Sequence, residues 1–130
     1  MIYIDTSVVL SRVFAEKRQP SPKFWSQPFV SSRLLEYEVF NRAHVHSSGV
    51  VDFQATRDLV DGILLIDLSP AALARALDPF PVQVRTLDGL HLATMVFLRS
   101  RAQTVSLATY DKRFADAAVA LGFGLAEVEG

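Results

Sequence analysis

The chain has 130 residues, of which 50% are hydrophobic and 21% are charged, and its formal net charge is −1. This composition excludes intrinsic disorder, and the length predicts a single domain over residues 1–130. The protein is not an overall polycation, so any contact with nucleic acid depends on a local basic patch or a bound cation. The chain contains no cysteine, which excludes disulfides, thiolate metal sites and a cysteine nucleophile.

The N-terminal residues lack the basic start and the long apolar run of a signal peptide. No apolar run approaches the roughly 18 residues that a membrane helix needs. We therefore expect a cytoplasmic protein that does not contact a membrane.

The chain opens with a predicted strand, a polar turn and a helix. Residues 2–4 favour a β-strand that stops at the helix-capping residues Asp5 to Ser7, and the apolar spacing that follows is helical. Asp5 is therefore expected at the C-terminal end of a strand, where open α/β sheets bind ligands. Prolines make residues 16–28 a loop or a short helix, and residues 29–30 predict a brief second strand.

The rest of the chain alternates helices with strands. Ser31 and Ser32 offer an N-cap for a helix that runs to about His46, with Gly49 as its end. The further expected elements are a helix over 52–61 with Gly62 as its C-cap, a strand over 63–68, a helix from Ser69–Pro70 to Pro79, an apolar helix over 87–101, a strand over 104–108, a helix over 114–121 and an edge strand over 125–128. This alternation predicts a three-layer α/β/α fold around a central, mostly parallel sheet.

Three aspartates lie at the ends of predicted elements. Asp5 ends the first strand, and Asp111 follows the strand over 104–108. If both strands are central and parallel, their carboxylates emerge at the same edge of the sheet. Asp88 begins a strongly apolar helix, which places it beside the core. Each aspartate could instead cap a helix or end a turn, so position alone leaves both interpretations open.

A fourth acid could come from the helix after Ser32. Glu36 and Glu38 are two positions apart, which corresponds to roughly 200° of helical rotation. Only one of them can point into a shared site, and hydrophobic periodicity does not choose between them. Clustered carboxylates repel one another unless they are protonated or neutralised by a cation such as Mg²⁺ or Mn²⁺. Such a metal site can activate water for phosphodiester hydrolysis.

Other polar residues have simpler interpretations. His91 lies one turn after Asp88 on an apolar helix and is interpreted as a hydrogen-bonded core residue rather than a ligand. His44 and His46 are expected on the surface, and Asp116 at the periphery. Cations that could hold a phosphate backbone, with a solvated surface as the default for each, are Arg12, Arg33, Arg42, Arg85, Lys112 and Arg113.

The chain resembles PIN-domain proteins, and among them the VapC-type toxins of bacterial toxin–antitoxin pairs. The resemblance rests on four segments that follow one another at family-like spacing over nearly the whole chain. They are IYIDTS at 2–7, SSRLLEYEV at 31–39, RTLDGLHLAT at 85–94 and ATYD at 108–111, with Phe114 beyond. Within the third segment, the block LDGLHLA at 87–93 is fairly specific, and the four segments together are strong.

The resemblance implies particular site residues. The catalytic acids would be Asp5, Glu38, Asp88 and Asp111, and the metal ligands Asp5, Asp88 and Asp111. Glu38 is chosen over Glu36 because the family's acid is usually followed by an aliphatic residue and then an arginine, as Val39 and Arg42 follow here. The secondary candidates are Thr6, Thr109 and Asp116.

The resemblance also implies a PIN-like fold and an Mg²⁺-dependent endoribonuclease that acts on cellular RNA, with Mn²⁺ as an alternative ion. A VapB-type antitoxin would inhibit it, and the toxin would form a homodimer. One alternative is a receiver-like phosphoryl-transfer domain, which is weakened because Thr6 and Ser7, rather than a second acid, follow Asp5. Another is a catalytically silent PIN-like module that binds RNA or protein; the presence of all four acids argues against it.

Overall fold

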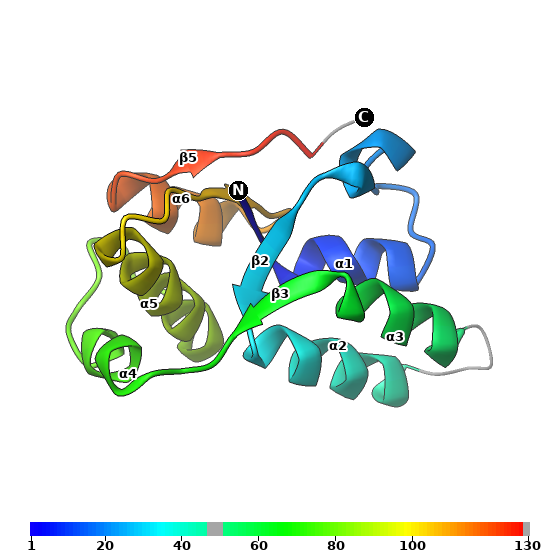
Figure 1. Ribbon diagram of the computed structural model, residues 1–130, viewed down its shortest axis with the longest axis horizontal. Coiled ribbons are helices and arrows are strands. Elements are labelled where there is room, and N and C mark those ends of the chain that lie inside the picture. The colour runs from blue at the N-terminus through cyan, green and yellow to red at the C-terminus, as the bar shows by residue number, and fades with distance from the viewer. Residues whose placement is uncertain (47–50, 129–130) are drawn as a thin grey trace.

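A five-stranded sheet, in which all strands are parallel, forms the centre of the computed structural model, which describes residues 1–46 and 51–128 (Figure 1). The strand order is β3-β2-β1-β4-β5. The strands are β1 (Ile2–Ile4), β2 (Phe29–Ser32), β3 (Ile63–Ile66), β4 (Ser106–Ala108) and β5 (Gly124–Leu125). The helices are α1 (Thr6–Val13), α2 (Leu34–Val45), α3 (Phe53–Asp61), α4 (Pro70–Ala76), α5 (Thr86–Ser100) and α6 (Lys112–Ala120), with a 3-10 helix at Pro22–Ser26.

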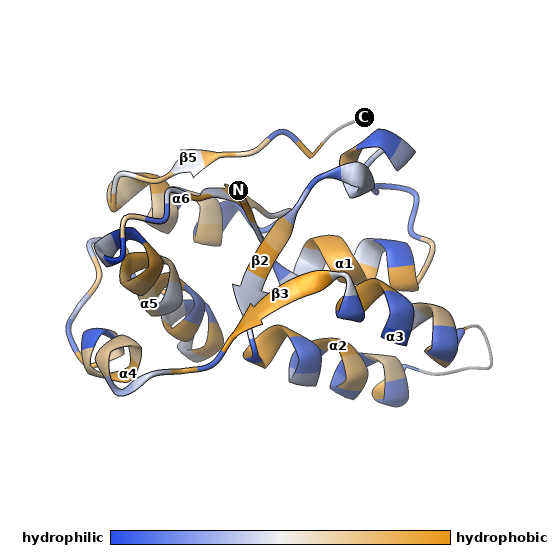
Figure 2. Cartoon of the chain, in the orientation of Figure 1, coloured by the Kyte–Doolittle hydropathy of each residue, from blue (hydrophilic) through white to orange (hydrophobic). Residues whose placement is uncertain are grey.

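Helices cover both faces of the sheet, as the three-layer prediction requires. Figure 1 shows α1, α2 and α3 on one side of the strands and α4, α5 and α6 on the other. Adjacent residues of β1 face opposite layers: Tyr3 packs with buried residues of α5 and α6, whereas Ile4 packs with those of α1 and α2. This alternation follows from the two-residue period of a strand. Figure 2 shows β3 as mostly apolar, while α2 and α3 carry separate hydrophobic and hydrophilic bands.

The direction of chain travel reverses beside β1. The chain moves from β1 to β2 and then β3 on one side, and β4 and β5 lie on the other side of β1. Ile4 pairs with Ala108, so the C-terminal ends of β1 and β4 are level. The backbone amide of Asp5 continues this pairing by donating to the Ala108 carbonyl over 2.9 Å. Parallel sheets bind ligands at such a switch point, outside the carboxyl ends of the strands.

Several element boundaries differ from those expected. Strand β2 continues through Ser31 and Ser32, which were expected to precede the helix; the Ser32 hydroxyl still accepts a hydrogen bond from the Leu34 amide over 3.2 Å. Helix α6 begins at Lys112 rather than residue 114 because Asp111 caps it. Strands β3, β4 and β5 are each shorter than expected. Gly49, the expected end of α2, lies outside the described residues. Within the described ranges, no helix has the combined length and hydrophobicity to cross a membrane.

Candidate functional site

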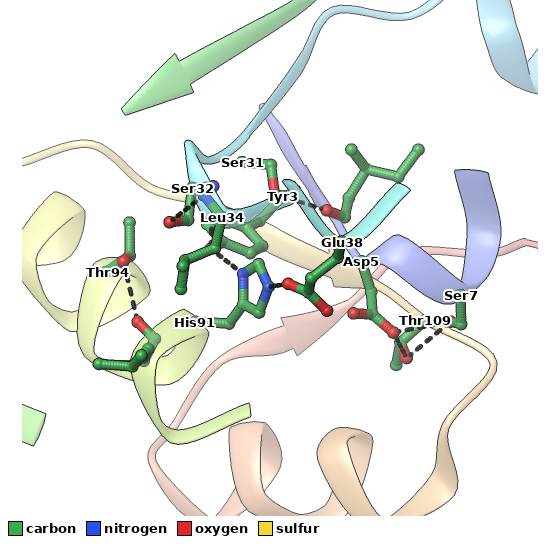
Figure 3. Close-up of polar contacts among 12 residues, drawn as sticks. Tyr3, Asp5, Ser7, Ser31, Ser32, Leu34, Glu38, His91, Thr94 and Thr109 are labelled. Carbon is green, nitrogen blue, oxygen red and sulfur yellow. Dashed lines mark hydrogen bonds and ion pairs between the residues drawn. The ribbon is translucent and has the colours of Figure 1, made fainter. Parts of the chain in front are cut away.

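Asp5 lies at the end of β1 and is the N-cap residue of α1, but its side chain does not cap the helix. Instead Oδ2 accepts hydrogen bonds from the hydroxyls of Ser7 and Thr109, each over 2.7 Å (Figure 3). The residue is only 5% exposed. Burial raises the pKa of the Asp5 carboxyl, and the nearby Glu38 raises it further, while the Ser7 bond, His91 and the Thr109 bond lower it. The interpretation of Asp5 as a simple helix cap is therefore wrong.

The two hydroxyls that hold Asp5 also join α1 to the loop after β4. The Ser7 Oγ accepts from the Tyr110 amide over 3.0 Å, and the Thr109 Oγ1 accepts from the Asp111 amide over 2.9 Å. Each hydroxyl thus donates to the carboxylate and accepts from the backbone. This arrangement fixes the orientation of Asp5 and the path of the chain toward Asp111.

Asp111 caps α6. Its Oδ1 accepts from the Arg113 amide over 2.9 Å and from the Phe114 amide over 3.4 Å. The sequence suggested a turn residue at this position, whereas in the structure Asp111 is the N-cap of α6 and its Oδ2 takes no part in the cap. The positive end of the α6 dipole lies here and favours negative charge. Asp111 is therefore held at the same sheet edge as Asp5.

Asp88 lies in the first turn of α5, where Arg85 is the N-cap residue, so Asp88 is not the cap. The pKa of Asp88 is raised to about 6. Burial is the largest cause, the charges of Asp5, Asp111 and Glu38 also raise the pKa, and His91 lowers it. A carboxyl responds in this way only to charges that lie close by. The four acids, which come from separate parts of the sequence, therefore share one electrostatic neighbourhood.

The two glutamates of α2 point in different directions, as their rotation on the helix requires. The Glu38 Oε1 lies 2.6 Å from the His91 Nε2, and Figure 3 shows its carboxylate next to Asp5. The Glu36 Oε2 lies 2.6 Å from the Arg57 Nη2, and Arg57 also binds Asp61, so Glu36 belongs to a separate ion-pair group. The structure brings Glu38, and not Glu36, to the other three acids.

His91 connects Glu38 to the core. The imidazole is fully buried, and its Nδ1 lies 2.7 Å from the Tyr3 hydroxyl. The interpretation of His91 as a buried, hydrogen-bonded residue is confirmed. Sequence reasoning missed Tyr3 and Ser7. A signal was present for Tyr3, because it precedes Asp5 by two residues and the backbone at Asp5 is still extended, so the two side chains are expected on the same side of the sheet.

The three secondary candidate residues differ in their distance from the acidic site and in their partners. Thr109 contacts Asp5, as described above. Thr6 is 5% exposed, and its Oγ1 is the one buried side-chain polar atom of the described residues that has no hydrogen-bond partner. Asp116 pairs with Lys112 over 2.9 Å on the exposed side of α6, which agrees with a peripheral position.

The cations proposed for phosphate binding fall into two groups. Arg12 lies 5.0 Å from the centre of the Trp25 ring, Arg33 pairs with Asp67 over 2.9 Å, and Lys112 pairs with Asp116. The remaining three are exposed and form no ion pair within the described part of the chain. Each lies within about one helical turn, in sequence, of one of the four acids. They are Arg42, Arg85 and Arg113.

The acids are close but do not form a preformed ion cage. Within residues 1–46 and 51–128, no three acidic or histidine side chains converge tightly enough to hold a metal ion. The donor set nevertheless suits Mg²⁺ or Mn²⁺, which prefer carboxylate and water oxygens. The buried hydroxyl of Thr6, which directly follows Asp5 in the sequence, has no hydrogen-bond partner among the described residues. The residues present therefore fit a hard divalent cation.

Comparison with known proteins identifies the family. The PIN domain family model matches residues 2–120. Ribonuclease VapC46 of Mycobacterium tuberculosis is 33% identical over 128 residues, which cover 95% of this chain and 95% of that protein. The chain therefore belongs to the PIN-domain family and, within it, to the VapC-type proteins.

Proposed function

We propose that this protein is a metal-dependent endoribonuclease and the toxin of a toxin–antitoxin pair. The observation that carries the proposal is the convergence of acids from separate elements: the Glu38 carboxylate lies next to Asp5 (Figure 3), and Asp111 follows the strand that pairs with β1. The charges of these three acids also contribute to the raised pKa of Asp88. The similarity to a protein named as a ribonuclease supports the choice of RNA as substrate. The proposal treats residues 1–130 as one PIN domain.

In this proposal Asp5, Asp88 and Asp111 would hold Mg²⁺ or Mn²⁺, and Glu38 completes the catalytic acids. When bound, the cation would neutralise charge on the phosphate and lower the pKa of an attacking water. The protein itself orients the carboxylate oxygens. Ser7 and Thr109 hold Oδ2 of Asp5 and favour its ionised form. The raised pKa values of Asp5 and Asp88 mean that a nearby cation would favour the ionised form of both carboxyls.

The RNA backbone would be held by cations at the rim of the acids. Arg42, Arg85 and Arg113 have no carboxylate partner in the described part of the chain and lie on α2, at the start of α5 and at the start of α6. These are the elements that carry Glu38, Asp88 and Asp111. Phosphate contacts of this kind give affinity without base specificity and weaken as salt increases.

Two protein partners belong to the proposal. A VapB-type antitoxin would cover the acids, and an arginine from it would pair favourably with so many carboxylates. The toxin would act as a homodimer. Membership of the VapC-type proteins supports the antitoxin, and the homodimer is an expectation from the resemblance to such toxins. The tests are co-purification with the antitoxin and the molar mass in solution.

The direct experiment incubates the purified protein with total RNA in Mg²⁺, in Mn²⁺ and in EDTA. We expect discrete cleavage products with either metal and intact RNA in EDTA. The variants Asp5→Asn and Asp88→Asn should leave RNA intact, while Asp58→Asn, on the exposed side of α3, should cleave like the wild type. RNA that stays intact in both metals, with RNA binding retained, would overturn the proposal in favour of a silent binding module.

A further inference from the structure

A buried row of hydrogen bonds leads from the centre of the sheet to Glu38. It begins at the Ser32 amide, which donates to the Tyr3 hydroxyl over 3.2 Å. The Tyr3 hydroxyl lies 2.7 Å from His91 Nδ1, and His91 Nε2 lies 2.6 Å from Glu38 Oε1. Tyr3 and His91 are both fully buried, whereas the Glu38 side chain is 16% exposed. The row therefore connects the protein interior with the edge of the acidic site (Figure 3).

The donors in this row can be assigned from its first member. A backbone amide only donates, so the Tyr3 oxygen accepts from Ser32 and keeps its own proton for another acceptor. The neighbouring hydroxyls of Ser31 and Thr94 give their protons to the carbonyls of Ile4 and Leu90, each over 2.9 Å. Neither hydroxyl therefore donates to Tyr3, and His91 Nδ1, 2.7 Å from the phenol oxygen, is the acceptor for the phenol proton. An Nδ1 that accepts leaves the proton of the imidazole on Nε2, which donates to the Glu38 carboxylate.

We propose that Tyr3 and His91 are positioning residues that hold Glu38 in place as an ionised hydrogen-bond acceptor at the acidic site. The inference rests on the proposed nuclease function for its consequence in catalysis, but the hydrogen-bond assignment does not depend on that function. Neither residue is placed near the substrate. They act through Glu38, as outer residues that orient the ligands of a metal site do.

The position of the two residues supports this role. Tyr3 lies on β1, two residues before Asp5, which directly follows this strand, and His91 follows Asp88 by about one turn of α5. The row thus joins the strand and the helix that carry two of the aspartates to the helix that carries the glutamate. In a simple core histidine, the acceptor for the Nε2 proton could have been any carbonyl. Here it is the one α2 glutamate that lies with the aspartates.

The test begins with the metal-free protein, so that it does not require nuclease activity. Nitrogen-15 NMR of the imidazoles distinguishes the tautomers, and the His91→Gln variant assigns the His91 signals against those of His44 and His46. We expect an unprotonated Nδ1 and a protonated Nε2 in the wild type. In Tyr3→Phe the Nδ1 loses its donor, so the tautomers should mix and the Glu38 carboxyl carbon should shift. Tyr37→Phe, on the exposed surface of α2, is the matched control and should change neither signal.

The second measurement is RNA cleavage by variants whose folding has been verified by circular dichroism and thermal unfolding. Tyr3→Phe and His91→Leu should each lower kcat about tenfold or more, with little change in KM. His91→Gln should recover part of the loss relative to His91→Leu, because its amide can donate to Glu38 from the place of Nε2. A loss of folding without a change in kcat per folded molecule would mean a purely structural role.

The outcomes separate the two proposals. A wild-type His91 that carries its proton on Nδ1, or equal cleavage by His91→Gln and His91→Leu, would overturn the positioning role even if RNA is cleaved. The expected tautomer, lost in Tyr3→Phe, together with no cleavage of RNA in any metal, would support the hydrogen-bond assignment and reject the nuclease. A tautomer that Tyr3→Phe leaves unchanged would overturn the inference in either case.

Discussion

Replacement of Asp88 by asparagine should stabilise the metal-free protein at neutral pH while it removes the proposed activity. The pKa of Asp88 is raised from 3.8 to about 6, mainly by burial and then by the charges of Asp5 and Asp111. The folded state therefore holds the proton more tightly than the unfolded state. The stabilisation from this carboxyl is complete below about pH 4 and is lost as the pH rises through about 6. At pH 7.5 the ionised group destabilises the fold.

The size of the effect follows from the same two pKa values. A change from 3.8 to about 6 corresponds to an upper limit of about 3 kcal/mol. Screening at this half-buried side chain reduces the expected gain in the free energy of unfolding to about 1–2 kcal/mol. In thermal unfolding at pH 7.5, Asp88→Asn should raise Tm by roughly 4–8 °C, and at pH 4 it should match the wild type.

The control is Asp58→Asn, whose carboxylate bonds to the Gln54 amide on the exposed side of α3 and which should show no such pH-dependent gain. Added Mg²⁺ or Mn²⁺ should stabilise the wild type, because ligands that bind the folded state shift unfolding by mass action, and Asp88→Asn should respond less. If Asp88→Asn is no more stable than the wild type at pH 7.5, the Asp88 carboxyl is not destabilised by burial and by the other acids, and the reasoning fails.

Three further predictions concern the same site. Thr109→Val removes one of the two hydroxyl bonds to Asp5 and should lower the free energy of unfolding by about 1 kcal/mol and slow cleavage; an unchanged rate and stability would mean that Asp5 does not depend on this bond. Asp5→Ala or Asp88→Ala should relieve growth inhibition on expression while circular dichroism shows an intact fold, and toxicity that persists in both would contradict the assignment. In titration calorimetry, Asp111→Asn should weaken the binding of Mn²⁺ although it can still cap α6, and unchanged affinity would place the metal elsewhere.

The layers of the fold could be predicted because they follow from local pattern. Residues 2–4 and 104–108 are short β-favouring runs, and the helices between them have capping residues such as Ser69 and Asp52 whose side chains do cap in the structure. The order of the strands could not be predicted, since β1 pairs with β4 across about a hundred residues. The ends of β3, β4 and β5 could not be predicted either, because an apolar run in the sequence does not show where hydrogen bonding between strands stops.

The candidate site, like the fold, could be predicted only in part from the sequence. Asp5 and Asp111 could be expected at one sheet edge because both follow parallel strands. Helix rotation showed that only one α2 glutamate could join them, but resemblance, and not rotation, selected Glu38. The structure separates the two through partners that are distant in sequence: His91 for Glu38 and Arg57 for Glu36. The function of Tyr3 was hidden because an aromatic residue in a strand resembles any core residue.

The most direct test of the account compares Glu38→Gln with Glu36→Gln in one cleavage assay. The two substitutions remove the same charge from the same helix, two residues apart, so they differ only in which side of α2 they alter. Glu38→Gln should lower the rate of Mg²⁺- or Mn²⁺-dependent RNA cleavage by about a hundredfold or more. Glu36→Gln should cleave at close to the wild-type rate and lose only its ion pair with Arg57. Equal rates for the two variants, or a greater loss in Glu36→Gln, would contradict the claim that Glu38 works together with Asp5, Asp88 and Asp111.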